Sequence, residues 1–185
     1  MSQGVERVLE LGCGYGRDAV YLANQGFDVT AVDFSAAALA LANSWTMRGD
    51  GAGRLDYLRD NLVDLDLAES AYDAVFSHRT LHLVVSRERL NKAFAEIHRV
   101  LKPGGTACVS LRNPRDPTQA KTHGSGGEYS EVSFRPGHRI LFLSDAELTE
   151  IVEPHFSIVA HEEVQERESR TQNYEAALHF LVLSK

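Results

Sequence analysis

Two acidic residues and three glycines near the start of the chain have the types and the spacing of a nucleotide-binding site. Glu10 stands two residues before Gly12, and Gly14 and Gly16 follow in the same short stretch. Glycines let a backbone turn sharply and approach a ligand closely. Asp33 comes about 20 residues after the first glycine, where a strand-end carboxylate can accept hydrogen bonds from both hydroxyls of a ribose. These residues predict a site for a ligand that contains a nucleoside.

The elements that position these residues can be read from the surrounding sequence. Residues 8–11 are Val-Leu-Glu-Leu, which predicts a buried strand, and the turn after it leads into a helix from Arg17 that Gly26 ends. Residues 29–32 predict a second strand that delivers Asp33 at its carboxyl end. The helix N-terminus then faces the glycine turn and can bind polar ligand groups. Together these segments predict a nucleotide-binding βαβ unit.

The positions of the glycines and of Glu10 distinguish between nucleotides. Nicotinamide enzymes favour G-x-G-x-x-G, but here the third glycine comes one residue early and Arg17 fills the place of a small residue. Glu10 would repel a pyrophosphate and suits a cationic ligand. S-adenosylmethionine carries a sulfonium and an ammonium group and no phosphate. A nicotinamide-dependent oxidoreductase is therefore the less favoured alternative.

The chain resembles the class I S-adenosylmethionine-dependent methyltransferases in a set of motifs that occur in the expected order. Residues 10–16, Glu-Leu-Gly-Cys-Gly-Tyr-Gly, match the first family motif, and residues 31–34, Ala-Val-Asp-Phe, match the second. Within the family, residues 16–35 look similar to compact bacterial enzymes of the tellurite-resistance or thiopurine type. The further matching segments, which extend the likeness over roughly the first 110 residues, are 59–62, 72–78 and 101–105.

The resemblance implies an α/β fold of the Rossmann-like, doubly wound type. We expect a mostly parallel seven-stranded sheet with helices on both faces and an antiparallel last strand. The segment 156–167 should pair antiparallel with 174–183, and residues 1–185 should form one S-adenosylmethionine-binding domain. Segment 112–143 is longer than a plain connection needs, and we expect it to be a substrate-side insertion.

Other sequence signals place the ends of the helices. Ser35 should cap an Ala-rich helix that runs through Trp45, and Ser86 should cap a longer helix. Pro103-Gly104-Gly105 should end that longer helix and begin a strand over 106–111. The first strand begins almost at Met1, so the N-terminal helices that usually cover the cofactor are expected to be missing. A truncated chain, an open minimal enzyme or a partner that supplies the lid would each explain this.

The resemblance also implies roles around the glycine loop. S-adenosylmethionine would be the cofactor and S-adenosylhomocysteine the product. The backbone of Gly12, Cys13 and Gly14, with Gly16 closing the turn, would lie under the methionine and ribose portion. Glu10 would orient the amino group, directly or through water, or it could instead pair with a surface cation.

The adenosine end of the cofactor would be held by residues after the second and third strands. Asp33 would take the ribose hydroxyls, although a strand-end acid can also simply cap the next helix. Phe34 would pack on one adenine face, or it could belong to the core. Asp60 would accept from the exocyclic amine, with Asp64 or Asp66 as alternatives, and the backbone of residues 61–62, Asn61 and Leu62, would read the ring edge.

Residues after the fourth strand would meet the methionyl group and the acceptor. The resemblance assigns Ser77 and His78 to the methionyl group, and we expect Arg17 to pair with its carboxylate. In-line methyl transfer needs a general base only when the acceptor is a hydroxyl or a protonated amine. His82 is the candidate for that base, but a histidine at this position can equally be a packing residue.

The charge and composition of the chain limit the kinds of partner that we expect it to bind. The chain has 185 residues and a formal net charge of −7, and its cations are scattered, which argues against a nucleic-acid substrate. No apolar run is long enough to span a membrane and no leader is visible, so we expect a cytoplasmic protein. The two cysteines and the histidines have no metal-ligand spacing, and we predict no metal site.

A methyltransferase that acts on a small-molecule acceptor is therefore the leading hypothesis. A non-catalytic S-adenosylmethionine-binding or scaffold subunit is a further alternative, because fold alone does not establish chemistry. A homo-oligomer is left open.

Overall fold

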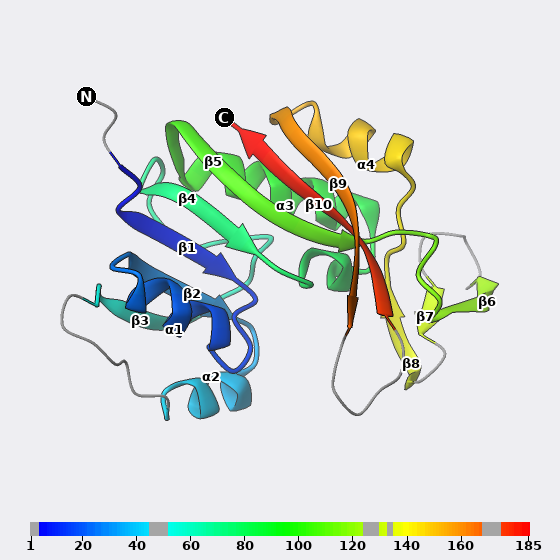
Figure 1. The fold of residues 1–185 in the computed structure, drawn as a ribbon, viewed down its shortest axis with the longest axis horizontal. Helices are drawn as coiled ribbons and strands as arrows, with labels where there is room; N and C mark the ends of the chain where they lie inside the picture. The colour runs from blue at the N-terminus through cyan, green and yellow to red at the C-terminus, as the bar shows by residue number, and fades with distance from the viewer. Residues whose placement is uncertain (1–3, 45–51, 124–129, 133–134, 168–174) are drawn as a thin grey trace.

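The chain is built around one sheet of seven strands. The computed structural model describes residues 4–44, 52–123, 130–132, 135–167 and 175–185. The strand order is β3-β2-β1-β4-β5-β10-β9, and β1 to β5 pair in parallel. β10 is antiparallel to both of its neighbours, so the predicted mostly parallel sheet with an antiparallel last strand is confirmed (Figure 1). The strands are β1 (Arg7–Leu11), β2 (Asp28–Asp33), β3 (Leu55–Arg59), β4 (Tyr72–Ser77), β5 (Leu101–Arg112), β9 (Ser157–Arg167) and β10 (Glu175–Ser184).

Helices cover both faces of this sheet, as expected, because its central strands are apolar on both sides. Val8 of β1 packs in one buried cluster with Ala19 and Ala23, whereas its neighbour Leu9 belongs to a second cluster with Phe94. This alternation follows from the period of two along a strand. The helices are α1 (Arg17–Asn24), α2 (Ala36–Ala42), the 3-10 turn η1 (Leu81–Val84), α3 (Arg87–Val100) and α4 (Asp145–Val152).

The predicted helix starts are confirmed by hydrogen bonds at the caps. The Ser35 hydroxyl accepts from the N–H of Ala38, and the Ser86 hydroxyl accepts from that of Arg89. Ser144 opens α4 with a full capping box. A serine at this position satisfies an N–H that the helix itself leaves without a partner, which is why these signals are readable from sequence.

Two predicted boundaries are wrong. α3 ends at Val100, and β5 already begins at Leu101, so the Pro103-Gly104-Gly105 stretch lies inside the strand rather than before it. The first residues of β5 pair with β4, which a turn signal alone cannot reveal. α2 ends at Ala42, and Trp45, through which it was expected to run, lies outside the described residues.

The segment 112–143 contains strands that were not predicted. β6 (Gln119–His123), β7 (Ser130–Val132) and β8 (Arg135–Ile140) form a separate antiparallel sheet at one end of the molecule (Figure 1). Its glycines at 124, 126 and 127 and its aromatic residues at 129 and 134 lie outside the described residues. The substrate-side role of this segment stays a prediction.

No helix among the described residues is long and apolar enough to cross a membrane.

Candidate functional site

A cavity of about 540 Å³ opens at the carboxyl ends of the central strands. β1 lies between β2 and β4 there, which is the point where the strand order reverses and where ligands bind in open α/β sheets. The volume lies in the usual range for small-molecule sites, about 300–1,000 Å³. The lining comes from the glycine loop, from β2 and the segments after β3 and β4, and from α3: Gly12, Gly14, Val32, Asp33, Phe34, Asp60, Asn61, Leu62, His78, Arg79, Thr80, Leu83, Val84 and Arg89.

The glycine loop needs glycine for two different reasons. Gly12 has φ +77°, and a Cβ there would lie 2.1 Å from the side chain of Thr80. Gly16 has φ +77° as well, and its Cβ would meet the hydroxyl of Tyr57 at 2.3 Å. Gly14, at φ +53°, has no atom within 4 Å of the place of a Cβ. Gly12 and Gly16 are thus required by packing, whereas Gly14 leaves open space beside the cavity.

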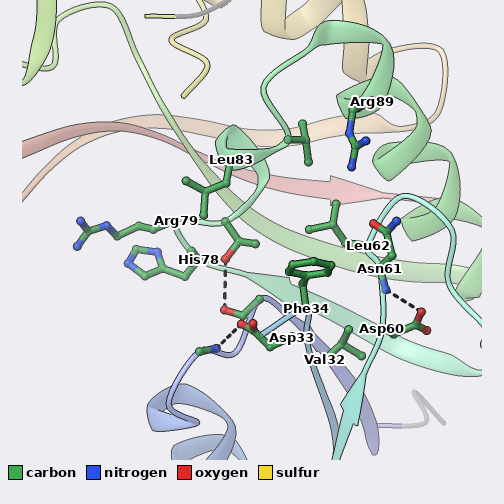
Figure 2. A pocket seen from close by; sticks show the side chains of 14 residues that line it. Val32, Asp33, Phe34, Asp60, Asn61, Leu62, His78, Arg79, Leu83 and Arg89 are labelled. Carbon is green, nitrogen blue, oxygen red and sulfur yellow. Dashed lines mark hydrogen bonds between the residues drawn. The ribbon is translucent and has the colours of Figure 1, made fainter. Parts of the chain in front are cut away.

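Asp33 fixes this loop to the end of β2. One carboxylate oxygen accepts from the N–H of Gly14 at 2.8 Å (Figure 2). The other accepts from the N–H of Ser35, also at 2.8 Å. Each carboxylate oxygen has a further lone pair, so Asp33 can still accept from a ligand hydroxyl. The cap of the next helix is Ser35 and not Asp33, and the ligand role of Asp33 stays a prediction.

Glu10 is a buried acid directly below the loop. It is 3% exposed, and Oε2 has no hydrogen-bond partner among the described residues. Burial, followed by the nearby charge of Asp18, raises the pKa of Glu10 to about 8, although Arg17 acts in the opposite direction. A buried carboxyl without a partner is costly, so this oxygen favours a ligand that brings a donor or a positive charge.

Cys13 is also buried in the loop. Burial and the charge of Glu10 raise the pKa of its thiol to about 12, so the thiol is protonated and unreactive at neutral pH.

The adenosine side of the cavity carries an exposed aromatic ring. Phe34 is 75% exposed, so it is not a core residue, and its ring stands between Asp33 and Leu62 at the opening (Figure 2). The guanidinium of Arg59 lies 5.9 Å from the ring centroid, and its Nε donates to the carbonyl of Phe34. A large apolar ring held open to solvent is suited to stacking on a planar ligand.

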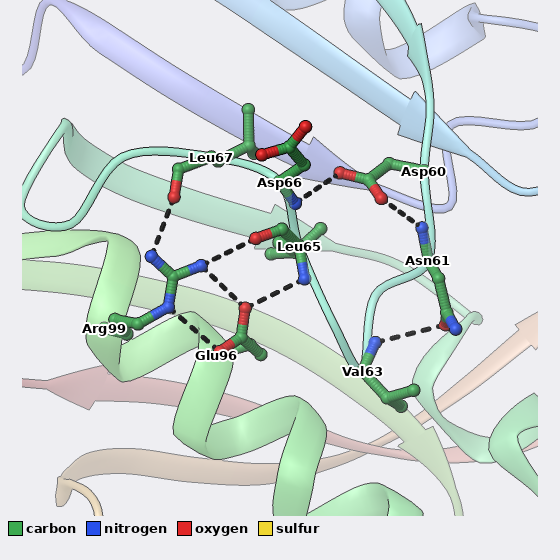
Figure 3. A network of polar contacts seen from close by, with 8 residues as sticks. All are labelled: Asp60, Asn61, Val63, Leu65, Asp66, Leu67, Glu96 and Arg99. Atoms are coloured by element: carbon green, nitrogen blue, oxygen red, sulfur yellow. Dashed lines mark hydrogen bonds and ion pairs between the residues drawn. The ribbon is translucent and has the colours of Figure 1, made fainter.

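Asp60 organises the segment after β3. Its carboxylate accepts from the N–H of Asn61 at 2.7 Å and from that of Asp66 at 2.9 Å (Figure 3). On the helix side, the guanidinium of Arg99 donates to the carbonyls of Leu65 and Leu67. The expectation that the Asn61 N–H reads a ring edge is thus weakened, because that N–H already donates to Asp60.

The residues after β4 form a hydrogen-bonded chain around His78. Nδ1 of His78 lies 2.9 Å from the hydroxyl of Ser110, and Nε2 lies 3.0 Å from a carboxylate oxygen of Glu166. His78 lines the main cavity and also a smaller one beside α1. Its carboxylate partner and the hydroxyl of Ser110 fix the orientation of the ring.

Six predicted site residues are not among the residues that line the main cavity: Glu10, Cys13, Gly16, Arg17, Ser77 and His82. Glu10, Cys13 and Gly16 lie in or directly below the loop that borders it, and the other three are engaged elsewhere. Ser77 is fully buried, and its hydroxyl donates to the carbonyl of Leu11, which joins β4 to β1. Arg17 pairs with Asp18 in solvent and lines only the smaller cavity. His82 is 3% exposed in η1 and does not line the cavity, so its geometry does not suit a general base.

Several lining residues were missed from the sequence: Arg79, Thr80, Leu83, Val84 and Arg89. All follow β4, in η1 and at the start of α3. The hydroxyl of Thr80 donates to the carbonyl of Gly12 at 3.3 Å. The available signal was positional, because the end of β4 lies beside the strand that carries the glycine loop.

Comparison with known proteins determines the family. A family model described as a methyltransferase domain matches residues 8–105, which hold the loop, β2 and the segment after β4. This chain belongs to the methyltransferase domain family. The predicted class I S-adenosylmethionine-dependent methyltransferase type is thereby confirmed, and the nicotinamide alternative loses its support. The tellurite-resistance likeness stays a prediction.

Curated relatives of this methyltransferase-domain protein are longer than the chain. The chain is 27% identical over 158 residues to the O-methyltransferase resE of Aspergillus sclerotiorum, covering 78% of this chain and 59% of that protein. It is 35% identical over 104 residues to a malonyl-[acyl-carrier protein] O-methyltransferase of Pectobacterium atrosepticum, covering 56% of this chain and 38% of that protein. The chain therefore spans less than two thirds of these relatives.

Solved structures share the fold over almost the whole chain. A S-adenosylmethionine-dependent methyltransferase of Methanosarcina mazei has a TM-score of 0.79 at 20% identity, with 99% of this chain and 93% of that chain covered. A Burkholderia thailandensis 1,6-didemethyltoxoflavin-N1-methyltransferase, solved with S-adenosylhomocysteine and its substrate, has a TM-score of 0.70 at 23% identity, with 97% and 70% covered. At these identities the likeness establishes the fold alone.

Proposed function

We propose that this protein is an S-adenosylmethionine-dependent methyltransferase that acts on a small-molecule acceptor by in-line methyl transfer. The observation that carries the proposal is the buried, unpartnered Oε2 of Glu10 below a glycine loop. A second acid, Asp33, lies at the same loop. Glu10, whose pKa is raised to about 8, would ionise beside a cationic ligand and pair with it, whereas a pyrophosphate offers its carboxyl no such partner.

The residues fit S-adenosylmethionine part by part. Glu10 would receive the ammonium group, Gly14 would leave room for the methionyl and ribose portion, and Asp33 would accept from the ribose hydroxyls. Phe34 would stack on the adenine, with Asp60 holding the segment that borders the ring. The cofactor supplies a sulfonium leaving group, so the protein's task is to orient the acceptor and to exclude water.

His78 is the better candidate for taking a proton from a hydroxyl acceptor. Unlike His82, it lines the cavity, and Glu166 lies 3.0 Å from its Nε2. With Nε2 held by Glu166, Nδ1 would take the proton, and the acceptor hydroxyl would have to replace the hydroxyl of Ser110 at Nδ1. An acceptor that is already an anion would need no such step.

A small acceptor is favoured over a macromolecule by charge and by size. The net charge of −7 opposes binding to nucleic acid. The cavity has the volume of a small-molecule site. The toxoflavin precursor named for the Burkholderia structure is likewise a small molecule.

Calorimetric titration with S-adenosylmethionine, S-adenosylhomocysteine and NADH tests the cofactor. We expect the first two to bind and NADH not to bind, and selective binding of NADH would refute the proposal. Incubation of the protein and methyl-labelled cofactor with a cell extract tests the reaction. We expect label in low-molecular-weight products; label only in macromolecules would refute the small-molecule acceptor, and cofactor binding with no labelled product would support the non-catalytic alternative.

A further inference from the structure

Three side chains from three different elements meet on the sheet face that packs against α4. Asp145 is the first residue of α4, His161 belongs to β9 and His179 to β10. Nε2 of His161 lies 2.9 Å from Nδ1 of His179, and Oδ1 of Asp145 lies 3.4 Å from the same Nδ1. Oδ1 of Asp145 is 4.0 Å from Nε2 of His161. None of the three lines the main cavity.

Hydrogen bonding fixes the tautomer of the buried histidine. His179 is fully buried, and its Nε2 lies 2.6 Å from the carbonyl oxygen of Leu143. A carbonyl oxygen only accepts, so Nε2 carries the proton. With Nε2 protonated, Nδ1 can present its electron pair to His161 and Asp145.

This arrangement places acceptor atoms against each other. The electron pair on Nδ1 of His179 faces a carboxylate oxygen of Asp145 at 3.4 Å, so a positive charge placed between them would be attracted to both atoms. A proton on Nε2 of His161 can be donated to Nδ1 of His179. Nε2 of His161 is too far from Oδ1 of Asp145, at 4.0 Å, to donate to that atom as well. Arg115, whose charge acts on His179, is paired with Glu163.

We propose that Asp145, His161 and His179 bind a divalent transition-metal ion, with zinc as the best match. Two imidazoles and one carboxylate are a common zinc ligand set. Zinc bonds of about 2.0–2.1 Å in a tetrahedron place ligand atoms roughly 3.3 Å apart. The three observed separations, 2.9, 3.4 and 4.0 Å, lie on both sides of that value.

The surroundings complete the site. The Leu143 carbonyl orients His179 from outside, as partners of metal-bound histidines commonly do. The Asp145 side chain is 65% exposed and that of His161 25% exposed, so an ion can enter and a water molecule can supply the fourth ligand. A bound ion would join the start of α4 to both strands of the β9–β10 pair. The site is thus structural and separate from the cofactor cavity.

The sequence alone predicted no metal site, because these residues have no recognisable spacing along the chain. The register of β9 with β10 brings the two histidines together, since His161 lies opposite Leu181, two residues from His179. Residues two apart on a strand point to the same face. The third ligand comes from the helix that covers that face.

Calorimetric titration of untagged, chelator-treated protein with zinc chloride tests the site. We expect one equivalent to bind to the wild type, and we expect His161→Gln and Asp145→Asn each to weaken binding by about tenfold or more. The matched controls are His155→Gln, whose ring bonds to Asn91, and Asp56→Asn, which pairs with Arg54; both should bind as the wild type does.

Thermal unfolding provides a second measurement that does not depend on enzymatic activity. Zinc should raise the melting temperature of the wild type and of both controls, and should raise it less in the two site variants. Circular dichroism without zinc should show the wild-type fold in all of them, because the substituted side chains are not buried. The proposal is overturned if the wild type binds no zinc, or if either site variant binds it as tightly as the wild type.

Discussion

Glu10→Gln should change how the stability of the protein depends on pH. The folded protein holds the pKa of Glu10 at about 8, chiefly through burial, against the ordinary value of 4.5 for a glutamate carboxyl. Between these values the folded state binds a proton that the unfolded state has released. The stabilisation from this proton is complete below pH 4.5 and is lost as the pH rises through 8.

The magnitude follows from the two pKa values. Their full difference corresponds to about 5 kcal/mol, and the part lost between pH 5.5 and 7.5 is about 2–3 kcal/mol. Glutamine has nearly the same shape and does not titrate. The wild type should therefore lose about 2–3 kcal/mol more than Glu10→Gln over this interval.

Urea unfolding of both proteins at pH 5.5 and 7.5 measures this difference directly, because all other titrating groups are shared. Glu162→Gln is a suitable control, since Glu162 is exposed on β9 and should show the wild-type dependence. Equal pH dependence in the wild type and in Glu10→Gln would refute the conclusion that Glu10 is protonated at neutral pH.

Two further substitutions test the packing on which the site depends. Gly12→Ala should destabilise the protein by more than Gly104→Ala, because both positions have φ near +77° but only at Gly12 does a Cβ meet Thr80; equal melting temperatures for the two variants would contradict the predicted clash. Asp116→Ala should cost about 3–5 kcal/mol in urea unfolding, because it removes the carboxylate that pairs with the buried guanidinium of Arg112, 4% exposed; a loss below about 1 kcal/mol would show that this ion pair contributes little to stability.

Much of the fold could be predicted because local signals and sheet geometry agree. Strands β1 and β2 lie where the sequence predicted them, and the serines at 35 and 86 cap helices where expected. The strands β6 to β8 could not be predicted, because their short, polar sequences pair only with each other. The start of β5 at Leu101 depends on its pairing with β4, which a helix-to-turn signal cannot reveal.

In the candidate site, too, some features could be predicted from the sequence and others could not. Gly12, Asp33, Phe34 and His78 line the cavity as expected, because each follows a strand whose carboxyl end was predicted. The inward direction of a side chain was less predictable. His82 sits in a 3-10 turn rather than at a strand end, and the turn points its ring into the interior.

Proton release during cofactor binding tests the central claim, which is that a buried acid below the glycine loop receives a cationic methyl donor. Titrations of S-adenosylmethionine at pH 7, in two buffers with different ionisation enthalpies, count the protons released. The wild type should release close to one proton as Glu10 ionises, and Glu10→Gln should release none and bind more weakly. Equal affinity and equal proton release in the two proteins would contradict the account.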